Sequence, residues 1–306
     1  MQNVIPQQDL VVVLGMHRSG TSLCANMLHA LGVDMAEAPG AGPHNQRGHW
    51  ERARINDLND QVLAALSRRW NDDAHVLALP PGWLDDARVQ AVRAELVAWL
   101  PSLLKGSQPA GFKDPRTARL MPLWQQVFAT LNVRPRFVLC VRNPAQVARS
   151  LSARDRMARE KAEYRWLVYN ADAVLGVAHS PVCVVPYEDW FIQPAANAAR
   201  LADFLDLAEP PPDLVQQIVD ADLRHDSAVE AAPPAMARRL HRLITRAAEL
   251  GHFDPDALAF CACLTEFERL VQPMLVEAEV LRASVVAQNR VIADLNTLVT
   301  QLRTAA

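Results

Sequence analysis

Hydrophobic positions along the chain follow two alternating rhythms. Residues 10–15 form a continuous apolar run that ends in glycine, which is typical of a strand buried on both faces of a parallel sheet. Further short strands are predicted at 111–113, 136–141 and 182–186. Between the strands, apolar residues recur with helical spacing and predict helices over 21–31, 51–67, 85–104, 118–131 and 144–159. This alternation predicts an α/β fold with a central parallel sheet and helices on both faces.

From residue 194 onward the pattern is purely helical. The last stretch, 281–302, repeats a mostly hydrophobic stripe every seven residues, which is typical of a coiled-coil-like helix. The stripe consists of Leu281, Gln288, Leu295 and Leu302, widened by Val285, Ile292, Val299 and the pair Val291 and Leu298. Such a helix either packs on the chain's own core, or forms a homodimer seam or a stalk to another partner. We therefore predict an α/β domain over 1–209, a helical extension over 210–270 and a long amphipathic helix over 271–306.

The segment Gly15–Ser22, GMHRSGTS, follows the first predicted strand and has the layout of a phosphate-binding loop. In a nucleotide-triphosphate loop, a lysine after the second glycine reaches the β- and γ-phosphates, and the next hydroxyl holds Mg²⁺. Thr21 occupies the lysine position here, but the glycines and the helix start still favour an anion. Arg18 adds a planar, permanently charged fork suited to phosphate or sulfate oxygens. The loop predicts phosphate binding, without the standard ATPase machinery, in a three-layer fold like that of the P-loop NTPases.

A second motif follows the strand predicted at 136–141. Arg142 lies at the carboxyl end of that strand, where open α/β sheets bind ligands. Ser150 lies eight residues further on, which is about two turns down the following helix. A strand-end arginine and a helix serine can reach one phosphate from two directions. The pair therefore predicts a second phosphate contact beside the glycine loop.

The two motifs, in this order, resemble those of the PAPS-dependent sulfotransferases, in particular their bacterial branch. PAPS is 3′-phosphoadenylyl sulfate; in that family a GxxRSGTS loop binds its 5′-phosphosulfate, and a strand followed by R-[DN]-P…S binds its 3′-phosphate. The resemblance covers about residues 10–207 and continues through GHWE at 48–51, FKDPR at 112–116 and PYED at 186–189. The arginine in the loop is similar to that of the tyrosylprotein and some carbohydrate sulfotransferases.

The resemblance implies in-line transfer of a sulfuryl group from the co-substrate PAPS to a hydroxyl or amine of an acceptor. The acceptor class that it favours is a glycan, a glycolipid or a small metabolite. Arg142 and Ser150 would hold the 3′-phosphate, and Arg18 would neutralise charge on the leaving oxygen. The 5′-phosphosulfate would be held by Gly15, His17, Arg18, Ser19, Gly20, Thr21 and Ser22. No metal is expected.

The catalytic base is expected in the region after the Gly- and Pro-rich segment. Glu51, at the end of GHWE, is the first candidate, because other members of the family use a glutamate or a histidine there. The alternatives are His49, which titrates near neutrality, and His44. A different interpretation makes Glu51 a first-turn helix residue stabilised by the helix dipole.

Three charged residues at the end of the strand 111–113 form a compact turn. Lys113, Asp114 and Arg116 either orient the acceptor or touch the sulfate, or else they form a structural salt bridge. Tryptophans near the loops, Trp50, Trp70 and Trp83, either stack on a sugar ring or pack in the core.

Composition narrows the setting in which this chemistry would occur. With 306 residues and a net charge of −3, the chain does not have the balance of a globally basic nucleic-acid binder. The five cysteines lack zinc-site spacing, which favours a reduced compartment and no metal. The first ten residues lack the features of a secretory signal, and no apolar run approaches the length of a membrane span. We therefore expect a cytoplasmic protein.

Two other functions stay open at the level of sequence. A P-loop kinase-like phosphotransferase would use the same fold, although the missing loop lysine argues against it. A non-catalytic nucleotide-binding protein would use the α/β domain to bind the nucleotide and the C-terminal helix to dock on a partner.

Overall fold

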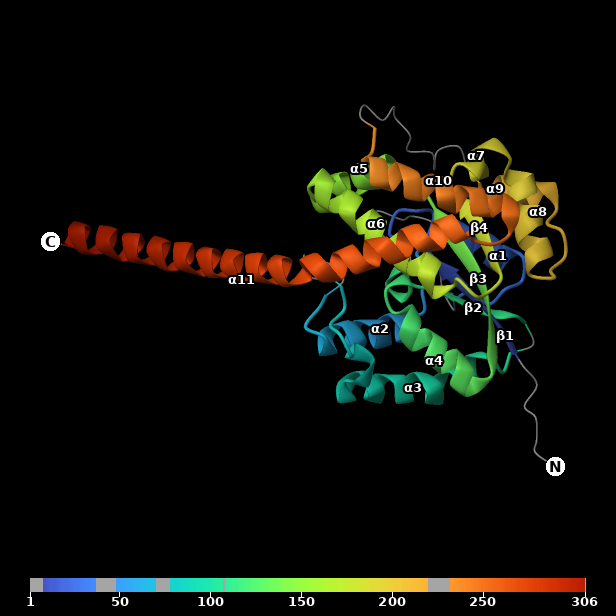
Figure 1. Cartoon of the computed structure of the whole chain (residues 1–306), viewed down its shortest axis with the longest axis horizontal. Helices are drawn as coiled ribbons and strands as arrows, with labels where there is room; N and C mark the ends of the chain where they lie inside the picture. Colours follow the sequence, from blue (N-terminus) through green and yellow to red (C-terminus); the bar gives the residue numbers. More distant parts are fainter. Residues whose placement is uncertain (1–7, 37–47, 70–77, 107, 220–231, 306) are drawn as a thin grey trace.

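A computed structural model describes residues 8–36, 48–69, 78–106, 108–219 and 232–305 (Figure 1). Four strands form one sheet: β1 (Gln8–Leu14), β2 (Ala110–Lys113), β3 (Val133–Val141) and β4 (Val182–Pro186). The helices of the first half are α1 (Thr21–Ala30), α2 (Ala53–Ala65), α3 (Ala87–Leu103), α4 (Met121–Leu131), α5 (Pro144–Asp155) and α6 (Arg159–Gly176). Those of the second half are α7 (Asp189–Ile192), α8 (Pro194–Phe204), α9 (Pro212–Ile218), α10 (Ala235–Leu250) and α11 (Pro255–Ala305).

The sheet is parallel throughout and has the strand order β2-β1-β3-β4. In the centre, Val12 pairs with Phe112 on one side and with Phe137 on the other. Because all strands run the same way, their carboxyl ends lie at one edge of the sheet. The residues after β1, β2, β3 and β4 therefore meet there, which is where the predicted motifs fall.

Side chains of β1 divide the core into two layers. Leu10, Val12 and Leu14 face one side, where the core includes residues of α2, α3, α4, α5, α6, α10 and α11. Val11 and Val13 face the other side, where they pack with residues of α1, α7, α8 and α9. Alternate residues of a strand point to opposite faces, so a continuous apolar run needs cover on both. The predicted three-layer α/β fold is thus confirmed.

The helix α11 leaves the body of the molecule. Its first part packs against α6 and α10, and its remainder projects as a single rod that ends far from the sheet (Figure 1). The predicted long C-terminal helix is confirmed, but it begins at Pro255 and runs through residue 270 without a break. The domain limits at 209 and 270 stay predictions. No helix in the described part of the chain is both long and apolar enough to cross a bilayer.

Some predicted helix limits are wrong. The helix predicted over 144–159 ends at Asp155, because Arg156 adopts a left-handed conformation with φ of 54°, and a second helix, α6, follows. The helix predicted from 118 begins instead with a 3-10 turn, Pro115–Ala118, and α4 starts at Met121. Glu51 precedes α2, whose first residue is Ala53, so it is outside the first helical turn.

Candidate functional site

The glycine loop connects β1 to α1 at the carboxyl edge of the sheet. Gly20 stands at the N-cap of α1 with φ of 86°, and a Cβ there would lie 2.5 Å from Cδ2 of Tyr187. Arg18 also adopts a left-handed conformation, with φ of 68°. A non-glycine residue in this region marks a backbone that its surroundings hold in place, often at functional sites. The loop therefore brings its backbone close to the segment after β4.

Arg18 and Ser150 lie in direct contact. The Nε of Arg18 donates to Oγ of Ser150 at 2.7 Å, across a sequence separation of 132 residues. Ser150 lies on α5, so the contact joins the glycine loop to the helix that follows β3. The structure thus brings together two residues that the sequence motifs predicted to share one ligand.

Arg142, at the end of β3, completes this corner of the site. Its guanidinium carbon lies 4.1 Å from the centre of the Tyr187 ring, a stacked arrangement that fixes the plane of the charged group. Its Nε donates to Oε1 of Gln146 at 3.0 Å, and Nη1 donates to the carbonyl of Arg18 at 3.3 Å. The indole Nε1 of Trp166 donates to the carbonyl of Arg142 at 3.0 Å. Side chains from three segments therefore set the position of Arg142.

The electrostatics of this corner favour an anion. Burial lowers the pKa of Arg18, and the positive charges of Arg154 and Arg142 lower it further. Like charges held together in a partly buried place gain from a bound negative group. Ser19 is fully buried, and its Oγ has no hydrogen-bond partner among the described residues. A buried hydroxyl without a partner is costly, so this atom is a candidate ligand contact.

A second group of polar residues lies beside the loop, around Lys113 at the end of β2. Its Nζ donates to Oε1 of Glu51 at 2.5 Å and to Oγ of Ser22 at 3.4 Å. The other carboxylate oxygen of Glu51 accepts from Nδ2 of Asn56 at 2.7 Å. Only 2% of the Lys113 side chain is exposed, against 20% for Glu51. Lys113 thus bridges the carboxylate of Glu51 to the start of α1.

Arg52 holds this second group against the sheet. Its Nε donates to the carbonyl of Gly111 at 2.9 Å, and its guanidinium pairs with Asp34 at 2.9 Å. Because Arg52 is the N-cap residue of α2, these contacts fix the start of that helix beside β2. Glu51 is therefore held by its chain neighbour as well as by its own ion pair.

The two candidate bases differ in charge state. Burial acts to raise the pKa of Glu51, but the charge and hydrogen bond of Lys113 outweigh it, so the pKa lies below its ordinary value of 4.5. Burial lowers the pKa of His49 from 6.5, and Lys113, Arg154 and Arg18 act in the same direction, against Glu51. At neutral pH, Glu51 is therefore an anion and His49 is uncharged. His49 meets the loop through its backbone, because Ser22 Oγ donates to its carbonyl at 3.4 Å.

Asp114 and Arg116 form a buried structural cluster. Arg116 Nε pairs with Oδ1 of Asp114 at 2.8 Å, and Nη1 pairs with Asp60 of α2 at 2.8 Å. Asn59, also on α2, donates to Oδ2 of Asp114 at 2.8 Å. These contacts match the salt-bridge alternative for the two residues, whereas Lys113 points toward Glu51 and the loop.

Other predicted residues lie around the site or beyond the described part of the chain. His17 makes an edge contact with the ring of Tyr169, with centroids 5.9 Å apart. Trp50 packs on His29 of α1, with centroids 4.6 Å apart. His44 and Trp70 fall outside the described residues.

Sequence reasoning missed Arg154 and Asn56. Arg154 acts on the pKa values of both Arg18 and His49, and Asn56 binds Glu51. Arg154 lies four residues after Ser150 on α5, so it occupies the same helix face. That spacing was the signal that could have found it.

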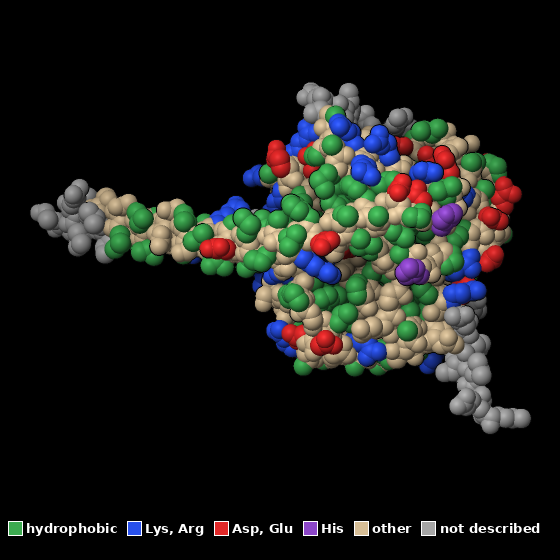
Figure 2. Space-filling view, in the orientation of Figure 1, with side chains coloured by type: hydrophobic (Ala, Val, Ile, Leu, Met, Phe, Trp, Pro, Cys, Tyr) green, Lys and Arg blue, Asp and Glu red, His purple; other side chains and the backbone are tan. Residues whose placement is uncertain are grey.

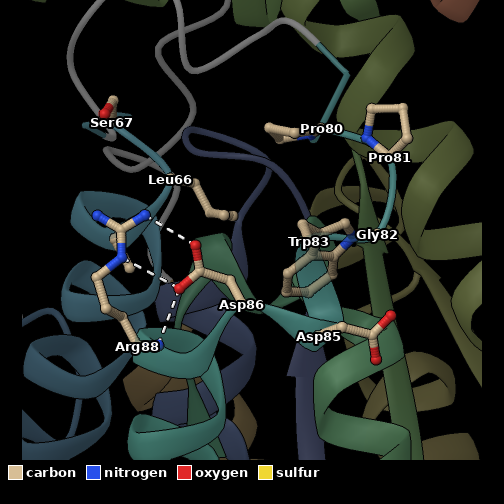
Figure 3. Close-up of a pocket in the computed structure, with 10 residues that line it drawn as sticks. Leu66, Ser67, Pro80, Pro81, Gly82, Trp83, Asp85, Asp86 and Arg88 are labelled. Carbon is tan, nitrogen blue, oxygen red and sulfur yellow. Dashed lines mark hydrogen bonds and ion pairs between the residues drawn. The ribbon is translucent and has the colours of Figure 1, made fainter.

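A separate pocket of about 420 Å³ lies at the C-terminal end of α2 (Figure 3). Its walls come from the end of α2 and from residues around Trp83, and Arg88 forms an ion pair with Asp86 on its rim at 2.8 Å (Figure 3). None of its lining residues belongs to the glycine loop or to the Lys113 group. Trp83 therefore lines this pocket and not the candidate site. In the described part of the chain, no three His, Cys, Asp or Glu side chains are grouped to hold a metal ion.

Comparison with known proteins yields one family and several weak structural likenesses. A family model described as "Sulfotransferase family" matches residues 10–211. No curated protein sequence matches the chain significantly.

Three similar solved structures can be compared over most of the chain. A sulfotransferase domain from the Synechococcus PCC 7002 olefin synthase shows 18% identity over 77% of this chain and 94% of that chain, with a TM-score of 0.45. A sulfotransferase domain from the curacin biosynthetic pathway shows 16% identity, 82% and 86% coverage and a TM-score of 0.44. Retinol dehydratase in complex with androsterone and inactive cofactor PAP shows 14% identity, 79% and 78% coverage and a TM-score of 0.33.

Proposed function

The chain belongs to the sulfotransferase family, and from that premise we propose that it transfers a sulfuryl group from PAPS to a hydroxyl or amine of an acceptor. The observation that carries the proposal is the joined corner of Arg18, Ser150 and Arg142. Cations from the glycine loop and from the end of β3 converge there, within a chain whose net charge is −3. Two clusters of phosphate oxygens on one donor molecule suit such an arrangement.

The residues present fit this donor. The buried Ser19 Oγ without a described partner, the N-terminus of α1 and Arg18 suit the 5′-phosphosulfate. Arg142 and Ser150, which enter from β3 and α5, suit the 3′-phosphate. Tyr187 would keep the Arg142 guanidinium oriented toward the 3′-phosphate, because the guanidinium carbon stacks 4.1 Å from the centre of the ring. The donor supplies an activated sulfuryl group, joined to the 5′-phosphate through oxygen.

In the transfer, the bond from sulfur to the phosphate oxygen breaks, and a bond from sulfur to the acceptor oxygen or nitrogen forms. Arg18 would lie beside the leaving phosphate, where negative charge grows, and its permanent positive charge would stabilise that change. The acceptor loses a proton. Glu51 is the group we propose to receive it, because its carboxylate is ionised, partly exposed and bridged by Lys113 to the loop. His49 is the alternative base.

Lys113 would act as a positioning residue for Glu51. The same ammonium contacts Ser22 of the loop, so the carboxylate and the donor site are held at a fixed separation. Near-attack geometry between acceptor and donor is a large part of catalysis in such displacements. A single buried lysine thus links the two halves of the proposed reaction centre.

Binding of the donor product tests this function. Adenosine 3′,5′-bisphosphate, ADP and ATP would each be added to the purified protein, and the unfolding temperature recorded. A ligand that binds only the folded state raises that temperature. We expect the bisphosphate to give the largest rise, because it alone carries a 3′-phosphate. Equal rises for all three, or none for the bisphosphate, would contradict the proposal, and ATP turnover with Mg²⁺ would favour a phosphotransferase instead.

A further inference from the structure

The projecting part of α11 exposes a long apolar surface. Gln272 donates to the carbonyl of Ala78 at 2.9 Å, and after it the helix runs to residue 305. That length corresponds to about 50 Å at 1.5 Å per residue. Among the described side chains from 273 to 297, all are exposed except the half-buried Leu275. Figure 2 shows hydrophobic side chains along much of this rod.

An exposed helix of this kind needs cover. Isolated helices are marginal in water, and helical stability in proteins comes mostly from packing of an apolar face. Leu281, Val285, Ile292 and Leu295 each expose more than half of their surface. A continuous exposed apolar surface on a soluble protein marks an interaction site. The exposed apolar surface of α11 therefore indicates that another chain packs against it.

The residues at heptad positions a and d of α11, called the seam below, indicate what kind of partner packs against it. With Leu281 at position d of a heptad, the a positions are Ala278, Val285, Ile292 and Val299, and the d positions are Met274, Leu281, Gln288, Leu295 and Leu302. Three of the four a residues are β-branched, and three of the five d residues are leucine. β-branched residues at a with leucine at d favour parallel, two-stranded coiled coils.

The charged residues at positions e and g, beside the seam, also favour a parallel pair of helices. In a parallel dimer, a g residue of one helix faces the e residue five positions later on the other. Glu277 occupies a g position and Arg282 the e position five residues on. Two copies of this helix in register therefore place opposite charges together on both sides of the seam. The remaining e positions of this stretch carry no acidic residue, so no like-charge contact with Glu277 opposes this register.

We propose that α11 forms a parallel, in-register coiled coil with α11 of a second copy of this chain. The joined seam buries the exposed residues at a and d in both copies. Because the helices run in the same direction, the two α/β domains stand at the same end of the stalk. This inference is independent of the proposed sulfuryl transfer, since the glycine loop, Arg142 and Glu51 lie within one chain.

The oligomeric state of the full chain tests the proposal, measured by analytical ultracentrifugation over a range of protein concentrations. We expect a dimer for the native chain and a monomer for Leu281→Asp. The control is Val280→Asp on the neighbouring residue, which is as exposed (64% against 60%) but lies outside the seam, so it should stay dimeric. Unchanged unfolding temperatures of the α/β domain would show that both variants fold.

Cross-linking tests the orientation. Leu281→Cys and Leu295→Cys would be made separately in a Cys263→Ser background, because Cys263 is exposed on the same helix. In a parallel, in-register dimer each introduced cysteine lies opposite the same cysteine of the second chain, so both variants should form disulfide-linked dimers under oxidation. Cross-linking only when the two variants are mixed would indicate an antiparallel pair and overturn the proposal. A monomeric native chain, which would mean that another protein covers α11, would overturn it as well, as would a dimer that survives Leu281→Asp.

Discussion

Gly20 is the residue at which the loop backbone and the Tyr187 ring come closest. Its φ of 86° is unfavourable for any other residue, and an added Cβ would lie 2.5 Å from the ring. We expect Gly20→Ala to lose about 1–2 kcal/mol of stability from the backbone conformation alone. The displaced ring would also release the Arg142 guanidinium that stacks on it. Binding of adenosine 3′,5′-bisphosphate, measured by calorimetry, should therefore weaken strongly.

Gly82→Ala is the matched control for this prediction. Gly82 has a similar φ of 70°, but an added Cβ there would meet nothing within 4 Å. The control should show the backbone cost in thermal unfolding and keep full affinity for the bisphosphate. Similar affinity losses in both variants would mean that contact with Tyr187 does not explain the role of Gly20.

Glu51 and His49 predict different pH profiles for the reaction. The pKa of Glu51 lies below 4.5, so a reaction that uses this carboxylate should keep its rate as the pH falls from 8 toward 5. Burial lowers the pKa of His49 from its ordinary value of 6.5, so a reaction that uses this imidazole should slow as the pH falls through that lowered pKa, whereas Lys113, against the effect of burial, keeps the Glu51 carboxylate ionised. We expect the flat profile, measured as release of adenosine 3′,5′-bisphosphate from PAPS.

Substitution separates the same two candidates. Glu51→Gln should lower the rate by about 10²–10⁴-fold, the usual contribution of a general base, and leave binding of the bisphosphate nearly unchanged. Glu95→Gln, which alters an exposed glutamate in an ion pair with Arg54, should do neither. A Glu51→Gln protein that keeps its rate, together with an inactive His49→Asn protein, would transfer the role to His49.

At the scale of elements, α6 supports the end of β3. Trp166 is fully buried on α6, and its indole donates to the carbonyl of Arg142. Trp166→Phe would keep most of the packing and remove this hydrogen bond, which is worth about 0.5–1.5 kcal/mol. We expect affinity for adenosine 3′,5′-bisphosphate to fall several-fold, with little change for ADP, because the loss acts through Arg142.

Trp124→Phe provides the comparison for this element. Trp124 is also fully buried, and its indole donates to Asn59 at 3.0 Å, away from the β3 end. Its loss should reduce thermal stability to a similar degree and leave the preference for the bisphosphate intact. If both variants lost that preference equally, α6 would have no specific role in holding Arg142.

A buried cluster of charged side chains connects the first part of α11, which packs on the core, to α6. Arg119 lies 2.7 Å from Asp172 of α6 and 3.7 Å from Glu268 of α11. Burial raises the pKa of Glu268 to about 7, against the pull of Arg119. A carboxyl whose pKa is raised on folding binds more protons in the folded state between about 4.5 and 7. Its contribution to stability therefore falls as the pH rises through this window.

Glu268→Gln should remove this dependence. At pH 8 the variant should be more stable than the native chain by on the order of 1–2 kcal/mol, because no buried charge has to form. Near pH 4 the two proteins should unfold alike, since the native carboxyl is then protonated. Glu266→Gln, at an exposed position of the same helix, should change little at either pH. Denaturant unfolding at the two pH values measures this, and a gain that does not depend on pH would refute it.

For the whole molecule, the three layers were predictable because a strand that is buried on both faces is a continuous apolar run in the sequence. The apolar run 10–15 requires cover on both faces of the sheet, and β1 is covered on both. The end of α5 was not predictable in this way, because Arg156 takes a left-handed conformation without a glycine or proline to signal it. The 3-10 turn before α4 was not predictable either, because it begins where the Asp114 side chain accepts a hydrogen bond from the backbone N–H of Arg116.

The candidate site was predictable in its parts but not in its contacts. The motifs named Arg18, Arg142 and Ser150, but only the folded chain shows that Arg18 and Ser150 touch over 132 residues of sequence. The bridge from Lys113 to Glu51 and Ser22 joins three segments, and no spacing along the chain encodes it. Such contacts depend on where strand ends meet in space, which local patterns do not determine.

The proposed contact between Arg142 and the 3′-phosphate is the feature that would distinguish a PAPS site from an ATP-like site most directly. Calorimetric titration of adenosine 3′,5′-bisphosphate and ADP into the native protein and Arg142→Gln gives four affinities under one set of conditions. In the native protein the bisphosphate should bind about 10–100-fold more tightly, as expected for a hydrogen bond between charged groups. In Arg142→Gln the two ligands should bind alike. Equal affinities in the native protein, or a preference that survives the substitution, would contradict the proposed donor site.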